Sequence, residues 1–154
     1  MKTKVLAVFI ILMLCIVSLV GCNMSVLNKE PVAADDEVLL IFNLDTQDKI
    51  YQVSMDYLVN GEKVGDAGIR NADGTPLSEN DGICHSFSLN REIDISKLSL
   101  QLYTADFVND FGSHEEEYKI ENEIKLTAEY GKTYYITIAG NKESGYTAFL
   151  KTAE

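Results

Sequence analysis

The chain contains no tryptophan, and its 154 residues include only two histidines, two prolines and three cysteines. Basic residues are also scarce, because 13 lysines and arginines stand against 24 aspartates and glutamates, for a formal net charge of −11 at pH 7. So acidic a surface repels nucleic acid and anionic headgroups, which argues against a DNA or RNA partner and favours cationic partners or Ca²⁺.

Long apolar runs are absent except at the start. Lys2 and Lys4 precede sixteen uncharged residues, Val5–Val20. As a helix this run would be roughly 24 Å long, which is short of the roughly 30 Å hydrocarbon core of a bilayer. A basic segment, an apolar segment and a small residue are the order expected of an export signal. The sequence therefore predicts a cleaved signal peptide over residues 1–21.

The end of that run, Leu19-Val20-Gly21-Cys22, resembles the lipobox of bacterial lipoproteins. The resemblance implies that signal peptidase recognises Leu19, Val20 and Gly21, and that Cys22 carries a diacylglyceryl group and becomes the new N-terminus. Two or more acyl chains hold a protein stably on a membrane. The expected location is the extracytoplasmic face of a bacterial cell membrane, or the outer membrane in a cell that has one.

Processing at Cys22 changes both the charge and the cysteine count. Residues 1–21 hold Lys2, Lys4 and no acid, so the remaining chain has a formal charge of −13. Cys15 leaves with the signal and Cys22 takes the lipid, so Cys84 has no partner for an intramolecular disulfide. We expect the fold to be held by its core and Cys84 to be a small buried residue.

The rest of the chain predicts a flexible tether, residues 22–36, and one domain, residues 37–154. A polar mixture with Pro31 indicates the tether. Apolar and polar residues then alternate with a period of two, which predicts strands. The expected strands are 37–44, 51–59, 62–69, 83–89, 97–104, 118–126, 133–139 and 146–150, with one helical turn at 106–111.

Two local signals refine this pattern. Asn60-Gly61 accepts positive φ at both centres of a type I′ turn, so a hairpin is expected there, with Tyr57 opposite Val64. Residues 126–138, "LTAEYGKTYYITI", resemble the tyrosine corner of Greek-key sandwiches, with the Tyr134 hydroxyl bonding back to the turn backbone. We predict an all-β fold: an antiparallel β-sandwich of about eight strands, immunoglobulin-like or Greek key.

No catalytic constellation stands out. Serine hydrolysis needs a base beside the nucleophile, and the two histidines, His85 and His114, accompany no Gly-x-Ser-x-Gly elbow. His85 is expected to be a satisfied core histidine or an edge residue. His114 with Glu115–Glu117 is expected to be a solvated charge run rather than a zinc site, because neighbouring side chains on an extended chain alternate sides.

Calcium suits the acidic charge better than zinc does, because its ligands are oxygens. Loop carboxylates are weak candidates for such a site. The pattern of the helix-loop-helix calcium loop fails, because Ile69 stands at its first ligand position. The candidates are Asp73, Asp81, Asp106 and Asp110, with Asp45 and Asp48 as further oxygen donors.

Two long loops, residues 70–82 and 105–117, are the expected binding surface, because binding residues concentrate on loops held by a rigid scaffold. Phe107 and Phe111 either plug an end of the sandwich or form a binding patch.

The whole chain resembles the small lipoproteins of bacterial envelopes, and that resemblance supplies no catalytic residue. We expect a non-catalytic binding or structural module of the envelope without a soluble cofactor. The alternative is a Ca²⁺-binding or glycan-binding accessory domain, and a hydrolase comes third.

Overall fold

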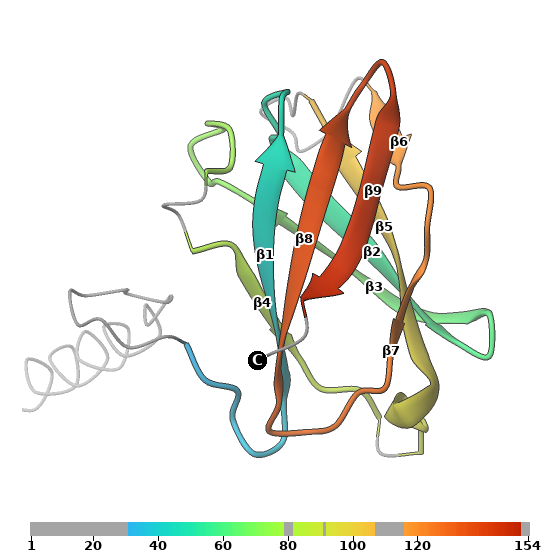
Figure 1. The fold of residues 1–154 in the computed structure, drawn as a ribbon. Coiled ribbons are helices and arrows are strands. Elements are labelled where there is room, and N and C mark those ends of the chain that lie inside the picture. Colours follow the sequence, from blue (N-terminus) through green and yellow to red (C-terminus); the bar gives the residue numbers. More distant parts are fainter. Residues whose placement is uncertain (1–30, 79–81, 91, 107–115, 152–154) are drawn as a thin grey trace, which may run out of the picture. The chain divides into compact units, whose positions relative to one another are not determined.

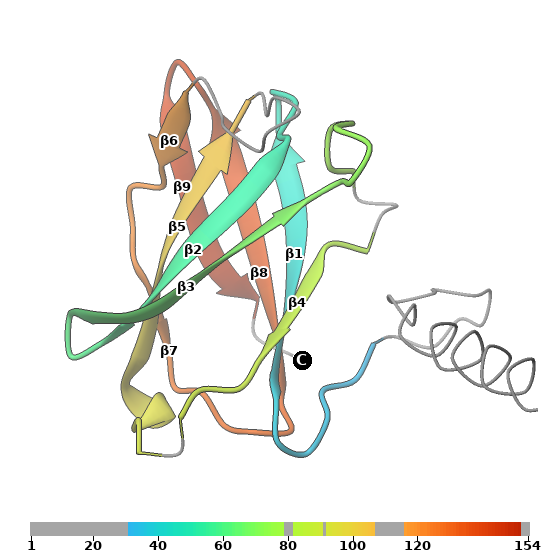
Figure 2. The same cartoon turned by 180° about the vertical axis from the view of Figure 1, so that it is seen from behind.

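The structure is a computed structural model that describes residues 31–78, 82–90, 92–106 and 116–151. The chain divides after Pro31 into two units, and apart from Pro31 everything described belongs to the second unit, Val32–Glu154. In the described ranges nine strands form two sheets, shown from opposite sides in Figures 1 and 2. The predicted all-β sandwich is confirmed. None of the helices described is long and apolar enough to cross a membrane.

The first sheet has the strand order β4-β1-β8-β9. Its strands are β4 (Cys84–Phe87), β1 (Val38–Thr46), β8 (Thr133–Asn141) and β9 (Gly145–Lys151). Strand β1 runs parallel to β8, whereas all other pairs in the sandwich are antiparallel. The prediction of a wholly antiparallel sandwich is therefore wrong for this pair. A parallel pair needs a long crossover, and the strands of the second sheet lie in the chain between β1 and β8.

The second sheet has the order β3-β2-β5-β6, and β7 also pairs with β5. Its strands are β2 (Gln52–Val59), β3 (Glu62–Arg70), β5 (Leu98–Ala105), β6 (Glu117–Lys119) and β7 (Ile124–Leu126). A short 3-10 helix, η3 (Ile95–Lys97), leads into β5 and is capped by the Asp94 side chain. Figure 2 shows this sheet in front, with the β2–β3 hairpin extending to one side.

The core lies between the two sheets and follows the period-two alternation of the strands. Strand β1 sends Val38, Leu40 and Phe42 inward, and all three are nearly inaccessible to solvent. The opposite sheet contributes the inward sides of β2 and β5, notably Val53, Met55, Leu100 and Leu102. Alternation leaves one outward face on each sheet, and these faces carry the polar side chains.

The predicted hairpin turn is present, but its register differs by one residue. Asn60 and Gly61 have φ values of 53° and 82°, as a type I′ turn requires. A bulge between Tyr57 and Leu58 then places Tyr57 opposite Gly65 rather than Val64. Gly65 suits that place because a Cβ atom there would lie 3.2 Å from the Tyr57 ring. The extra residue, Val64, is partly exposed.

The strand predicted over 118–126 is split into β6 and β7. Between them the chain leaves the second sheet and bonds to the edge of the first. The amide of Glu121 donates to the Tyr146 carbonyl at 3.0 Å. The Asn122 side chain bonds both backbone groups of Ala148: Oδ1 accepts from the amide at 2.9 Å, and Nδ2 donates to the carbonyl at 2.5 Å. Figure 1 shows this segment passing beside β9. We call residues 120–123 the edge crossing.

The tyrosine corner at the entry to β8 is confirmed. The Tyr134 hydroxyl donates to the Thr127 carbonyl at 3.0 Å and accepts from the Glu129 amide at 3.0 Å. Two backbone groups of the connection between β7 and β8 therefore have their partners in one side chain. The tyrosine corner and the two-sheet sandwich are features that immunoglobulin-like domains also have. The strand order of the first sheet places β1 between β4 and β8.

Replacing Tyr134 with phenylalanine keeps the ring and removes both hydrogen bonds of the corner. We expect Tyr134→Phe to lower the free energy of unfolding by about 1–2 kcal/mol, measured by urea denaturation. Tyr103→Phe is the matched control, because Tyr103 bonds a side chain on the outer face and should change stability by less than about 0.5 kcal/mol. Equal effects of the two substitutions would contradict a structural role for the corner.

Candidate binding groove

A polar groove of about 520 Å³ lies on the outer face of the second sheet. Its lining comes from four neighbouring strands, β3, β2, β5 and β6, whose outward positions meet there because of the register. The polar side chains that line it are Gln52, Ser54, Asp56, Lys63, Asp66, Tyr103 and Glu117. We call this the outer groove.

An ion-pair network occupies one side of the outer groove. Asp56 and Asp66 are directly opposite each other on β2 and β3, a placement of like charges that destabilises a sheet. Lys63 relieves it, because its Nζ lies 2.6 Å from Asp56 Oδ1 and 2.9 Å from Asp66 Oδ2. Hydrogen bonds to these two carboxylates raise the pKa of Lys63, so its amine stays protonated and is no nucleophile at neutral pH.

Two hydroxyls complete the groove. The Tyr103 hydroxyl donates to Asp56 Oδ2 at 3.1 Å, and the Ser54 hydroxyl donates to Glu117 Oε1 at 2.8 Å. The three carboxylates outnumber the single ammonium group, so the lining is negative by two charges at neutral pH. Side chains fixed by their own hydrogen bonds are pre-organised for a ligand. Such a lining can accept hydrogen bonds from a basic or strongly donating group.

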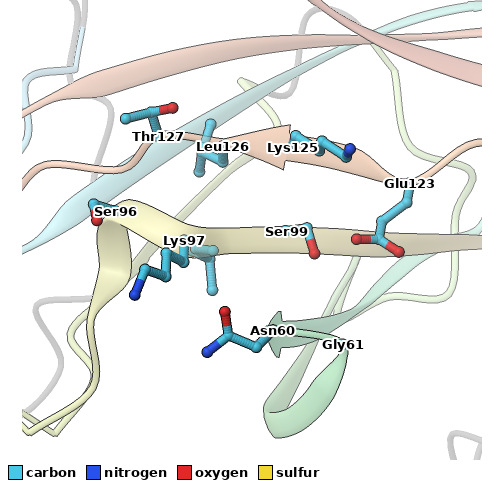
Figure 3. A pocket seen from close by; sticks show the side chains of 10 residues that line it. Asn60, Gly61, Ser96, Lys97, Ser99, Glu123, Lys125, Leu126 and Thr127 are labelled. Atoms are coloured by element: carbon cyan, nitrogen blue, oxygen red, sulfur yellow. The ribbon is translucent and has the colours of Figure 1, made fainter.

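A second hollow, of about 360 Å³, lies on the same outer face at the level of β7. Figure 3 shows β5 between β7 and the 60–61 turn, with side chains from all three around the hollow. Lys97 and Lys125 bring positive charge, Glu123 brings negative charge, and Ser99 and Thr127 bring hydroxyls. The outer groove is lined from β6 and this hollow from β7, so the two lie on either side of the edge crossing.

His85 is not part of the outer groove. It lies on the edge strand β4, where its Nε2 is 2.6 Å from the hydroxyl of Tyr57 on the opposite sheet. Burial lowers the pKa of His85 and so favours its neutral imidazole, and the tautomer of the ring decides which of the two groups donates. Burial and the charge of Asp66 raise the pKa of Tyr57, which keeps that hydroxyl protonated. The expectation of a satisfied or edge histidine is confirmed.

The structure brings together only two of the described candidate calcium ligands, Asp48 and Asp106, which contact the amide and the ammonium group of Lys142. Asp73 closes a local turn by accepting from the amide and hydroxyl of Thr75, at 3.0 and 2.7 Å. Asp106 pairs with Lys142, and Asp48 accepts from the Tyr146 hydroxyl at 3.0 Å. Among the described residues, no group of three or more histidine, cysteine, aspartate or glutamate side chains could hold a metal ion.

Several expectations concern residues that the structure does not describe. These are the lipobox residues Leu19, Val20, Gly21 and Cys22, the aspartates Asp81 and Asp110, and His114, Phe107 and Phe111 with most of the expected helical turn. Cys84 is described: it is half-buried and forms no disulfide with any described residue.

The expected binding loops and the outer groove are different surfaces. In the described part of the 70–82 loop, Asn71 bonds Thr75 and Pro76, so this loop is folded on itself. The outer groove does not follow from the apolar alternation that predicts the strands, because its lining comes from their polar sides. Its signal was present in the sequence, since Ser54 and Asp56 alternate with the apolar residues of β2, and Lys63 and Asp66 follow the turn.

Comparison with known proteins gives no family. No family model matches the chain, and no curated protein matches it either. Among solved structures, a protein from Eubacterium rectale aligns with a TM-score of 0.37 and 12% identity, over 84% of this chain and 98% of its own. The membrane-binding domain of pneumolysin aligns with a TM-score of 0.33 and 12% identity, over 77% and 98%. Likenesses this weak carry no argument about function.

The half-buried His85 makes the stability of the domain depend on pH. Between the lowered folded pKa and the ordinary value of about 6.5, the unfolded chain binds a proton that the folded chain does not. Stability is therefore lost as the pH falls below about 6.5, by up to about 1.4 kcal/mol for each unit of lowering. We expect the difference in unfolding free energy between wild type and His85→Gln to be constant above pH 7.5. At pH 5 the wild type should have lost stability relative to the variant. A difference that stays constant down to pH 5 would contradict burial of a neutral His85.

Proposed function

We propose that this protein is a lipid-anchored, extracytoplasmic module of the bacterial cell envelope that binds a protein partner and performs no catalysis. Cys22 carries the lipid, residues 22–36 form the tether, and the sandwich presents the outer groove to the partner. The outer groove is the observation that carries the binding part of the proposal. The anchor rests on the sequence alone, through the apolar run and the lipobox that ends at Cys22.

The chemistry of the outer groove supports binding. Its one amine is held between two carboxylates, and its two hydroxyls donate to carboxylates, with no imidazole among the lining residues. Its excess of two negative charges fits a lysine or arginine side chain of a partner, because an oppositely charged group gains hydrogen bonds and Coulomb energy there. The groove lies on strands rather than loops, so its geometry is rigid.

A calcium-binding function has less support. Asp73 lies in a turn of its own, and Asp48 and Asp106 both contact Lys142, whose ammonium group repels a cation. A glycan-binding function has a separate basis, which is on the other sheet.

The anchor is tested by replacing Cys22. We expect Cys22→Ala to abolish incorporation of labelled fatty acid and to leave the uncleaved chain in the cell, because lipid transfer needs the thiolate. Cys15→Ala is the matched control and should be processed like the wild type. A Cys22→Ala chain that is still cut after Gly21 and released without lipid would contradict the anchor.

The groove is tested by capture from detergent-solubilised envelope. We expect the double variant Asp66→Asn and Glu117→Gln to lose a partner that the wild type captures, because it removes two negative charges from the lining. The control double variant, Glu129→Gln and Glu143→Gln, removes the same charge from exposed positions elsewhere and should keep the partner. The captured complex should also weaken as salt rises from 0.05 to 0.5 M. Identical capture by both double variants would rule out the groove as the contact.

A further inference from the structure

The outer face of the first sheet differs in character from that of the second. On β8 and β9 the outward residues include Thr133, Tyr135, Thr137, Thr147, Phe149 and Lys151, and β1 adds Ile41, Asn43 and Asp45 between β4 and β8. Only Asp45 and Lys151 are charged among them. We call this surface the aromatic face.

Phe149 is the feature of the aromatic face that needs an explanation. Its side chain is 50% exposed, although it is a large apolar residue in the middle of a regular strand. The register places Phe149, Thr137 and Asn43 in one row across β9, β8 and β1. Tyr135 is two residues from Thr137 on the same side of β8, so it is the diagonal neighbour of Phe149, at a distance that aromatic side chains can bridge.

Charge separates the two outer faces. The outward positions of the second sheet include seven charged side chains, namely Asp56, Lys63, Asp66, Arg70, Glu117, Lys119 and Lys125. On the aromatic face the two charges are of opposite sign and lie in the rows on either side of Phe149, so the face has no net charge. In a chain with a formal charge of −11, a neutral face with an exposed aromatic ring suits a neutral ligand.

The side chains around Phe149 indicate what kind of neutral ligand fits. One exposed phenylalanine buries too little apolar surface to hold a bilayer, and threonine and asparagine neighbours are unlike the apolar centre of a stable protein interface. A sugar ring has an apolar C–H side that packs on an aromatic ring, and hydroxyls at its edge that bond to hydroxyl and amide groups. Phe149 and Tyr135 supply the first kind of contact, and Thr137, Thr147 and Asn43 supply the second.

We propose that the aromatic face binds a neutral polysaccharide chain laid across β9, β8 and β1, with sugar rings packed on Phe149 and Tyr135. This site is separate from the outer groove and from Cys22, so it goes beyond the function proposed above. An open sheet face suits an extended polymer, because a chain laid across the strands can contact the outward side chains of one strand after another.

The test uses the full chain purified in detergent and two insoluble neutral probes, chitin and cellulose. We expect the wild type to be retained on at least one of them, and Phe149→Ala to weaken retention at least tenfold while it still unfolds cooperatively, since Phe149 is half exposed. Val64→Ala is the matched control, because Val64 is also a partly exposed apolar residue but lies on β3 of the other sheet. It should be retained like the wild type.

Three results would overturn the proposal. The first is no retention of the wild type on either polysaccharide. The second is equal retention of Phe149→Ala and wild type. The third is binding to phosphatidylglycerol vesicles, or self-association in sedimentation, that Phe149→Ala abolishes, because either would assign the face to a bilayer or to a second copy. The outer groove and the Cys22 anchor are untouched by Phe149→Ala, so a failure here leaves those proposals standing.

Discussion

The two hydrogen bonds between the Asn122 side chain and the backbone of Ala148 hold the edge crossing, the segment that joins the two sheets, against the edge of β9. The Asn122 side chain thereby pairs the backbone N–H and C=O groups at the edge of β9 that a neighbouring strand would otherwise pair. With the Glu121 amide bonded to Tyr146, these hydrogen bonds hold the edge crossing against the first sheet, while β6 and β7 on either side stay paired with β5 in the second. One short segment therefore joins both sheets along this side, and Gln101 supports it by donating to the Ile120 carbonyl at 2.8 Å.

The edge crossing also shapes the outer face of the second sheet. Because it separates β6 from β7, the outer face of the second sheet is divided into the outer groove, which Glu117 lines, and the hollow that Lys125 and Glu123 line. On the first sheet β8 and β9 form a hairpin, and its register places Phe149 beside Thr137. A charged face and a neutral one therefore lie on opposite sides of one core. Proteins that bind two different partners at once need such a separation, since neither ligand then competes with the other.

The sequence predicted the local features of this fold well, because neighbouring residues determine them. Asn60-Gly61 required a tight turn, and the spacing from Thr127 to Tyr134 set the tyrosine corner. The split of the 118–126 strand was missed although its signal was present. Asn122 lies on the same side of the chain as Tyr118, Ile120, Ile124 and Leu126. A polar residue at such an inward position marks a place where the strand leaves the sheet.

The parallel pairing of β1 with β8 could not be predicted, because residues more than ninety positions apart determine it. The outer groove also depends on such pairing, since the register of four strands brings Ser54, Lys63 and Glu117 together.

Hydrogen exchange at the amide of Ala148 tests the role of Asn122 most directly, because this N–H donates to the Asn122 side chain rather than to a strand. The expected result is slow exchange in the wild type and exchange about tenfold faster or more in Asn122→Ala, while the amides of the central strands β2 and β5 keep their protection. Equal exchange of the Ala148 amide in the two proteins would contradict the dependence of this sheet edge on Asn122.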